Sequence, residues 1–158
     1  MRDSAKEFAS KYALQFSKRL GEGKDGVVLS TDRNTAVKFF NDADIYSREL
    51  HAYRVLKGEN IDEICGHHIP QLRNFDDSLR AIEMTIVTPP FLLDFAAAYT
   101  EEEVEYFAFD DDVVAEREIH WAEVFGERWP DVVEMRRLFL ERTGLVLLDL
   151  SLNNIRFA

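Results

Sequence analysis

Three glycines near the start of the chain have the spacing of a loop that can bind phosphate. They form Gly21-x-Gly23-x-x-Gly26-x-Val28, and glycine lets backbone N–H groups approach a phosphate closely. The same spacing also opens dinucleotide-binding folds, in which the loop must lead from a strand into a helix. Here the loop leads into residues 27–31, which are mostly β-branched or apolar, and this predicts a turn between two antiparallel strands. A plain hairpin that binds no ligand is the simpler alternative.

A lysine and a glutamate follow the glycine loop on neighbouring expected elements. Lys38, in Ala36-Val37-Lys38, lies on a predicted strand among apolar residues, where an unpaired ammonium group is unfavourable. Glu49 lies on the next predicted helix and could pair with Lys38, holding it toward the α- and β-phosphates of a nucleotide. In the alternative interpretation, Lys38 extends to water and Glu49 faces solvent.

An acid and an amide five residues apart form the third candidate group. Asp149 lies within residues 147–152, which contain four leucines, and burial there would be unfavourable without a partner. We expect Asp149 to act as a base that orients a hydroxyl group, or to anchor the loop through hydrogen bonds. Asn154 could offer an amide oxygen to a divalent cation.

Apolar periodicity and turn residues predict the elements that position these groups. Gly58 is expected to cap the helix that carries Glu49, and Pro89-Pro90 to end the last strand before a shift in composition. From Phe91 onward most patterns are helical. The expected elements are a leading helix to residue 13, strands at 14–20, 27–31, 35–40, 69–75 and 79–87, helices at 43–57, 113–125 and 131–143, and strands at 145–148 and 155–157.

The expected fold class is α+β. Residues 1–88 are predicted to form a five-stranded antiparallel lobe with one helix, and residues 89–158 a reduced helical lobe. The sequence contains no internal repeat, and no flexible linker separates the two lobes. We therefore expect them to form a single domain.

In this combination, the chain resembles the protein kinase-like superfamily. The glycine loop, Ala36-Val37-Lys38, a glutamate in a helix and Asp149-x-x-x-x-Asn154 occur in the family's order, over roughly residues 14–158. The resemblance implies ATP and Mg²⁺ (or Mn²⁺) as cofactors, with residues 83–88 as the adenine-binding hinge. The implied nucleotide-binding residues are Gly21, Gly23, Gly26, Val28, Ala36, Lys38 and Glu49; the implied catalytic residues are Lys38 and Asp149, and the implied metal ligand is Asn154.

Two features depart from the family's pattern. Leu147-Leu148 stand where the family has His-Arg or His-Gly, so regulation through a phosphorylated activation segment is not expected. The chain ends at Ala158, whereas the family's Asp-Phe-Gly segment, with its principal Mg²⁺ ligand, follows the catalytic loop. We therefore expect this aspartate to be absent and any activity to be slow, unless residues 110–112 or a second copy of the chain supply another acid.

Two functions of different classes fit this combination. One is a minimal phosphotransferase that moves the γ-phosphoryl group of ATP to a hydroxyl group on a protein. The other is a pseudokinase, which binds nucleotide weakly or not at all and serves as an interaction module for a partner that covers the incomplete C-terminal lobe. A truncated coding sequence is a third possibility.

Composition restricts the partners and the compartment. Residues 1–58 hold 11 Lys+Arg and 8 Asp+Glu, and residues 59–158 hold 8 and 22, so the two parts carry +3 and −14 of the net charge of −11. The acidic part would repel nucleic acid, whereas a small anion could bind in the N-terminal part. Cys65 is the only cysteine, which predicts a reducing, cytoplasmic setting. No apolar stretch predicts a signal peptide or a membrane span.

Overall fold

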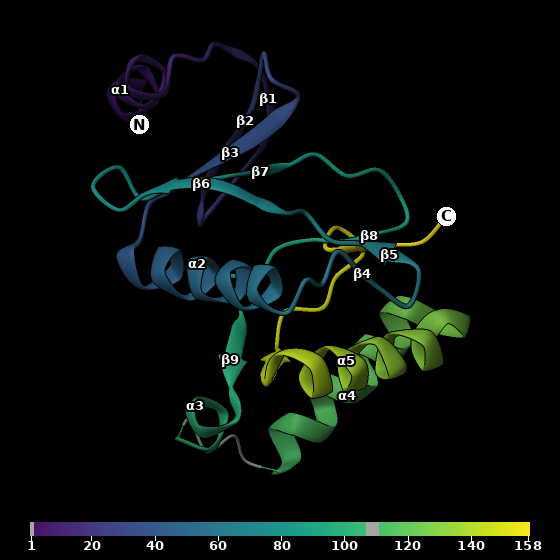
Figure 1. The fold of residues 1–158 in the computed structure, drawn as a ribbon. Helices are drawn as coiled ribbons and strands as arrows, with labels where there is room; N and C mark the ends of the chain where they lie inside the picture. Colours follow the sequence, from purple (N-terminus) through teal and green to yellow (C-terminus); the bar gives the residue numbers. More distant parts are fainter. Residues whose placement is uncertain (1, 107–110) are drawn as a thin grey trace.

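A five-stranded antiparallel sheet forms one side of the computed structural model, which describes residues 2–106 and 111–158 (Figure 1). The strand order is β1-β2-β3-β7-β6. The predicted α+β class and the five-stranded antiparallel sheet are confirmed. The strands are β1 (Phe16–Gly23), β2 (Gly26–Thr31), β3 (Thr35–Phe40), β6 (Leu72–Asp76) and β7 (Ala81–Thr85).

Two helices cover the two faces of this sheet, α1 (Arg2–Tyr12) above it and α2 (Ala43–Gly58) below it in Figure 1. Val37 and Phe39 of the central strand β3 pack in one apolar cluster with Phe8 of α1. Alternate residues of a strand point to opposite faces, so Ala36 and Phe40 pack in the other cluster, with residues of α2. Every residue of β3 is therefore buried, and the face that carries Lys38 is turned toward α2.

The predicted cap of α2 at Gly58 is wrong. Gly58 is the last residue of the helix, and the left-handed residue that follows its end is Asn60, at φ 53°. The N–H group of Ile61 donates to the carbonyl oxygen of Leu56 at 2.8 Å, which is the contact that closes a Schellman motif. Asparagine tolerates the left-handed region better than most residues, so this position does not require glycine.

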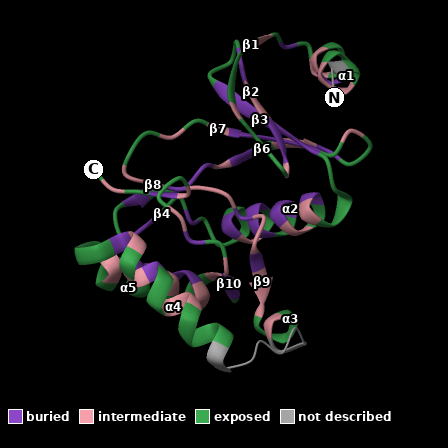
Figure 2. Ribbon diagram, turned by 180° about the vertical axis from the view of Figure 1, so that it is seen from behind, coloured by how far each residue is buried: buried purple, intermediate pink, exposed green. Residues whose placement is uncertain are grey.

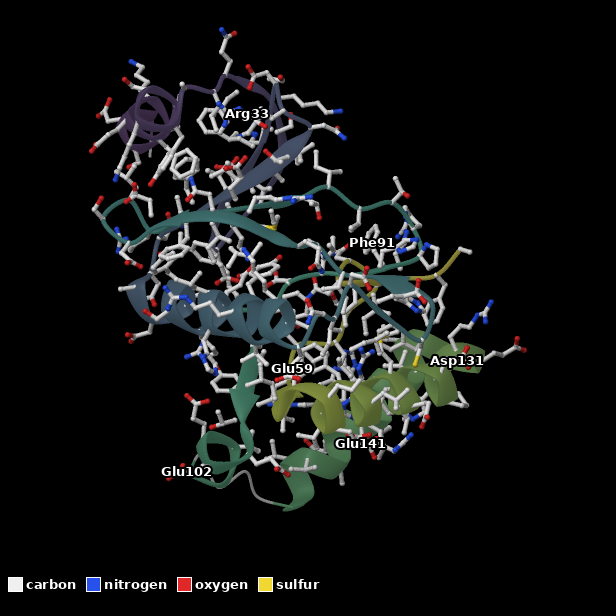
Figure 3. The ribbon with its side chains drawn as sticks, viewed as in Figure 1. Arg33, Glu59, Phe91, Glu102, Asp131 and Glu141 are labelled. Carbon is white, nitrogen blue, oxygen red and sulfur yellow. The ribbon has the colours of Figure 1, made fainter. Side chains whose placement is uncertain are left out.

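Short strands join the middle of the chain to its C-terminal segment. The prediction of helical structure from Phe91 is wrong for residues 91–100, which contain two strands that pair with segments near the C-terminus. The helices predicted at 113–125 and 131–143 are present. Phe91, labelled in Figure 3, lies opposite Arg156 in one of these pairs. The second sheet has the order β11-β8-β5-β4 and the third pairs β10 with β9. The strands are β4 (Glu63–Ile64), β5 (His67–His68), β8 (Phe91–Leu92), β9 (Ala98–Thr100), β10 (Leu145–Leu147) and β11 (Ile155–Arg156).

The remaining helices lie on the far side of α2 from the large sheet (Figure 1). They are α3 (Glu101–Tyr106), α4 (Asp111–Phe125), the 3-10 turn η1 (Gly126–Arg128) and α5 (Trp129–Thr143). Trp121, Phe125 and Phe139 anchor them in the core, while much of the outer surface of α4 and α5 is exposed (Figure 2). Gly144 ends α5 in the left-handed conformation, at φ 68°. No helix among the described residues is long and apolar enough to span a membrane.

Gly26 allows the close contact between the glycine hairpin and β3. It has φ +155°, and a Cβ atom at this position would lie 1.9 Å from the backbone carbonyl oxygen of Phe39. We expect Gly26→Ala to lower the free energy of unfolding by about 1–3 kcal/mol, because the backbone of β3 must shift to relieve the overlap. Denaturant unfolding measures this change. Gly21→Ala is the matched control, because its Cβ would meet no atom within 4 Å. Equal losses of unfolding free energy in the two variants would contradict the close contact between Gly26 and β3.

Candidate functional site

A cleft of about 640 Å³ lies beside the large sheet, between the glycine hairpin and the loops that precede β9 and β11. The structure brings together eight of the nine residues that the sequence singled out for the site. The predicted site residues that line the cleft are Gly21, Gly23, Gly26, Val28, Ala36, Lys38, Glu49 and Asn154. Asp149 is not among its lining residues.

Lys38 is held inside the cleft by two carboxylates. Its Nζ atom lies 2.6 Å from Oε2 of Glu49 and 3.3 Å from Oδ1 of Asp94, and only 11% of its side chain is exposed. Burial lowers the pKa of Lys38, but the charges of the two carboxylates outweigh this effect and raise the pKa above its ordinary value. The alternative in which Lys38 extends to water is therefore wrong.

Glu49 is the buried partner of Lys38 on α2. Its side chain is 1% exposed, so the alternative in which it faces solvent is also wrong. Burial raises the pKa of Glu49 to about 7, and the ammonium group of Lys38 opposes this rise. The site therefore holds a carboxyl group whose charged form is disfavoured by burial and favoured by a cation 2.6 Å away.

The glycine loop is the tip of the β1–β2 hairpin, as the sequence predicts. Gly23 and Gly26 are paired, and the loop continues into strand β2 rather than into a helix. Asn41, after β3, fastens the tip: its N–H group donates to the carbonyl oxygen of Asp25 and its side-chain amide to that of Lys24, each at 3.0 Å. The hairpin is thus tied down over the cleft at its tip.

The predicted hinge contributes part of the cleft wall. Met84, Thr85, Ile86 and Val87 line the cleft. Glu83 does not line it, because its side chain is buried and its Oε1 atom accepts a hydrogen bond from the Thr35 hydroxyl group at 2.6 Å.

Asp149 and Asn154 lie together on the loop between β10 and β11. The Nδ2 atom of Asn154 lies 3.5 Å from Oδ2 of Asp149 and 3.4 Å from its carbonyl oxygen. The expectation that the neighbouring leucines bury Asp149 is wrong, since Asp149 is exposed. Leu147 and Leu150 point into the core instead, and the carboxylate of Asp149 is left accessible to a second molecule.

Sequence reasoning missed Asp94, which contacts Lys38 at the cleft. It lies within the apolar residues 91–99, and its position there did not indicate a role in the site. The available signal was Asp94-Phe95-Ala96, an aspartate and an aromatic residue followed by a small one, directly after a short apolar strand. This run differs from the Asp-Phe-Gly of the kinase-like superfamily in its last residue. It also precedes Asp149 and Asn154 in the chain, whereas Asp-Phe-Gly in that superfamily follows the residues that Asp149 and Asn154 resemble. The acid predicted at residues 110–112 cannot be compared, because Asp110 and the side chains of Asp111 and Asp112 lie outside the described residues.

Neither of two comparisons with known proteins found a match for this chain. No model of a known protein family matches it, and a search of curated proteins found no match. Among the described residues, no three or more His, Cys, Asp or Glu side chains are grouped so that they could hold a metal ion.

The raised pKa of Glu49 predicts a pH dependence of stability. Between its ordinary value of 4.5 and about 7, the folded protein binds more protons than the unfolded chain, so the contribution of Glu49 to stability falls as the pH rises through this window. We expect the free energy of unfolding of the wild type, relative to Glu49→Gln, to fall by roughly 3 kcal/mol across it.

Denaturant unfolding at several pH values measures this difference. Glu59→Gln, an exposed substitution just after the same helix, is the control and should give a difference that does not change with pH. If the difference in unfolding free energy between the wild type and Glu49→Gln is also independent of pH, the raised pKa of Glu49 is contradicted.

Proposed function

We propose that the chain has a kinase-like fold and is an ATP-dependent phosphotransferase that moves the γ-phosphoryl group of ATP to a hydroxyl group on a protein. Residues 1–88 form the N-terminal lobe of this fold and residues 89–158 a reduced C-terminal lobe. The observation that supports the proposal most is the buried ammonium group of Lys38, which Glu49 holds at 2.6 Å inside a cleft bordered by a glycine hairpin.

The cleft offers different surfaces to the two ends of a nucleotide. Val28, Ala36, Met84 and Leu93 line it with apolar groups, which suit an adenine ring. The backbone of the glycine hairpin and the ammonium group of Lys38 suit the phosphates, since N–H groups and a cation stabilise their negative charge.

The chemistry of phosphoryl transfer depends on positioning and on neutralising charge. Bound Mg²⁺ or Mn²⁺ would supply the positive charge that the transferred group requires, and the amide oxygen of Asn154 can act as one of its ligands. Lys38 orients the phosphates. Asp149, exposed and next to Asn154, accepts the proton of the acceptor hydroxyl group.

A second candidate function is a pseudokinase that acts as an interaction module. Two observations favour it: Asp149 is not among the residues that line the cleft, and α4 exposes Val113, Val114 and Ile119, the last at 62%. These apolar side chains on a helix of the C-terminal lobe could contact a partner protein.

Replacing Lys38 tests the phosphate contact. We expect ATP to raise the thermal stability of the wild type, by the equivalent of about 3 kcal/mol when ATP is present at 100 times its Kd. Lys38→Met should lose most of this stabilisation, because the phosphates lose their buried cation. Lys24→Met is the control: it removes an exposed lysine at the hairpin tip and should respond to ATP as the wild type does. Equal responses of Lys38→Met and wild type would refute the phosphate role.

Replacing Asp149 separates chemistry from binding. We expect Asp149→Asn to reduce transfer from radiolabelled ATP to a generic protein acceptor by about 100-fold or more, while stabilisation by ATP is unchanged, because the base contacts the acceptor and not the nucleotide. Asp131→Asn, the same change at an exposed site on α5, is the control.

Transfer assays with Mg²⁺ and with Mn²⁺ distinguish the phosphotransferase from the pseudokinase. Transfer that survives Asp149→Asn would overturn the role of this residue. Stabilisation by ATP without transfer in either metal would favour the pseudokinase over the phosphotransferase.

A further inference from the structure

We propose that Asp94, in the turn between β8 and β9, is the carboxylate through which the cleft binds the divalent cation of a metal–nucleotide complex. This inference rests on the proposed function and names the residue that replaces the aspartate expected after the catalytic loop.

The charge of the cleft favours a metal-bound nucleotide over a bare one. Glu22, Asp25, Glu49 and Asp94 line the cleft, and Lys38 is the one basic side chain among its described lining residues. Glu49 lies against Lys38 at 2.6 Å, and Glu22 forms an ion pair with Arg19, which leaves the carboxylates of Asp25 and Asp94 in excess. A polyanionic triphosphate would be repelled by them, so a divalent cation is needed between the phosphates and at least one carboxylate.

The geometry of Asp94 makes it the most suitable of these carboxylates. Asp94 has a left-handed backbone, at φ 62°, and its Oδ1 atom accepts a hydrogen bond from the N–H group of Ala96 at 3.1 Å. The orientation of the carboxylate is therefore fixed by its own turn. Its contact with Lys38 is also through Oδ1, and no hydrogen bond from the described residues reaches Oδ2. One carboxylate oxygen is thus available to a metal ion.

The need to neutralise the charge of Lys38 does not by itself explain why Asp94 lies at the cleft. The ammonium group already has Glu49 at 2.6 Å, whereas Asp94 lies at 3.3 Å. Charge-assisted hydrogen bonds are usually about 2.7–2.9 Å long, so the second contact is a weak one. A carboxylate 30% exposed to solvent can contact an incoming cation through its second oxygen, and Lys38 keeps Glu49 as its partner in any case.

Two pairs of strands hold Asp94 beside the predicted metal ligand Asn154. On one side β8 pairs with β11, and the N–H group of Leu93 donates to the carbonyl oxygen of Asn154 at 2.7 Å. On the other side β9 pairs with β10, and the N–H group of Leu148 donates to the carbonyl oxygen of Ala97 at 3.0 Å. The loop with Asp94 therefore lies against the loop that carries Asp149 and Asn154, although the helices α3 to α5 separate the two loops in the sequence.

The ligand set fits a magnesium ion that is bound mainly through its nucleotide. Mg²⁺ in proteins keeps several waters and uses one or two carboxylates together with substrate phosphates. Asp94 supplies the carboxylate and Asn154 an amide oxygen. Such a site requires no group of three acidic or imidazole ligands from the protein, and the described residues contain no such group.

Calorimetric titration with a non-hydrolysable ATP analogue tests the inference without any activity assay. The Kd is measured with excess Mg²⁺ and with EDTA, for the wild type, Asp94→Asn and Asp25→Asn. Asp94→Asn should fold, because asparagine also tolerates the left-handed region and can accept the Ala96 hydrogen bond. Asp25→Asn makes the same change of charge at another lining residue and is the matched control.

We expect Mg²⁺ to lower the Kd of the wild type and of Asp25→Asn by about tenfold or more, and to have almost no effect on Asp94→Asn. In EDTA, Asp94→Asn should bind at least as tightly as the wild type, because a negative charge near the phosphates is removed.

The remaining outcomes overturn one proposal or both. An equal effect of Mg²⁺ on Asp94→Asn and wild type, or an equal loss in Asp94→Asn and Asp25→Asn, would overturn the role of Asp94 and leave the nucleotide site intact. If Mg²⁺ does not change the Kd of the wild type for the analogue, the role of Asp94 is likewise overturned and the nucleotide site remains. No binding to the wild type in either condition would overturn the proposed function, and this inference with it.

Discussion

The buried ion pair between Lys38 and Glu49 is the interaction on which the cleft depends. Removing one partner of such a pair typically lowers stability by about 3–5 kcal/mol, so β3 and α2 must keep the relative position that holds the two groups 2.6 Å apart. The strand β3 can meet this constraint because both of its faces are covered and all of its residues are buried. The fold thereby keeps the ammonium group of Lys38, the one basic side chain among the described lining residues, inside the cleft, where the proposed binding of phosphates requires it.

The other side of the cleft depends on pairing between distant segments. The middle of the chain, at β8 and β9, pairs with the C-terminal strands β11 and β10, and the loops between these strands bring Asp94, Asp149 and Asn154 into one region. In this arrangement the carboxylate proposed to bind the metal comes from before the helices α3 to α5, whereas the resemblance to the kinase-like superfamily would place it after Asn154. The site proposed here thus combines local features of the N-terminal part with contacts that form only when the whole chain folds.

The difference between local and distant contacts explains what the sequence predicted. The hairpin, the strand with Lys38 and the helix with Glu49 follow one another directly, and glycine spacing and apolar periodicity predicted all three. The strands β8 and β9 are too short for a periodic pattern, and their partners lie beyond three intervening helices, so Asp94 was missed. The burial of Asp149 was predicted wrongly, because a run of leucines does not show which of them turn into the core.

A crystal structure with Mn²⁺ and a non-hydrolysable ATP analogue would test the central claim most directly, since anomalous scattering locates the metal. The account predicts a phosphate oxygen within hydrogen-bond distance of Nζ of Lys38 and a manganese peak about 2 Å from a carboxylate oxygen of Asp94. A nucleotide bound outside the cleft, or a metal in the cleft that Asp94 does not contact, would contradict it.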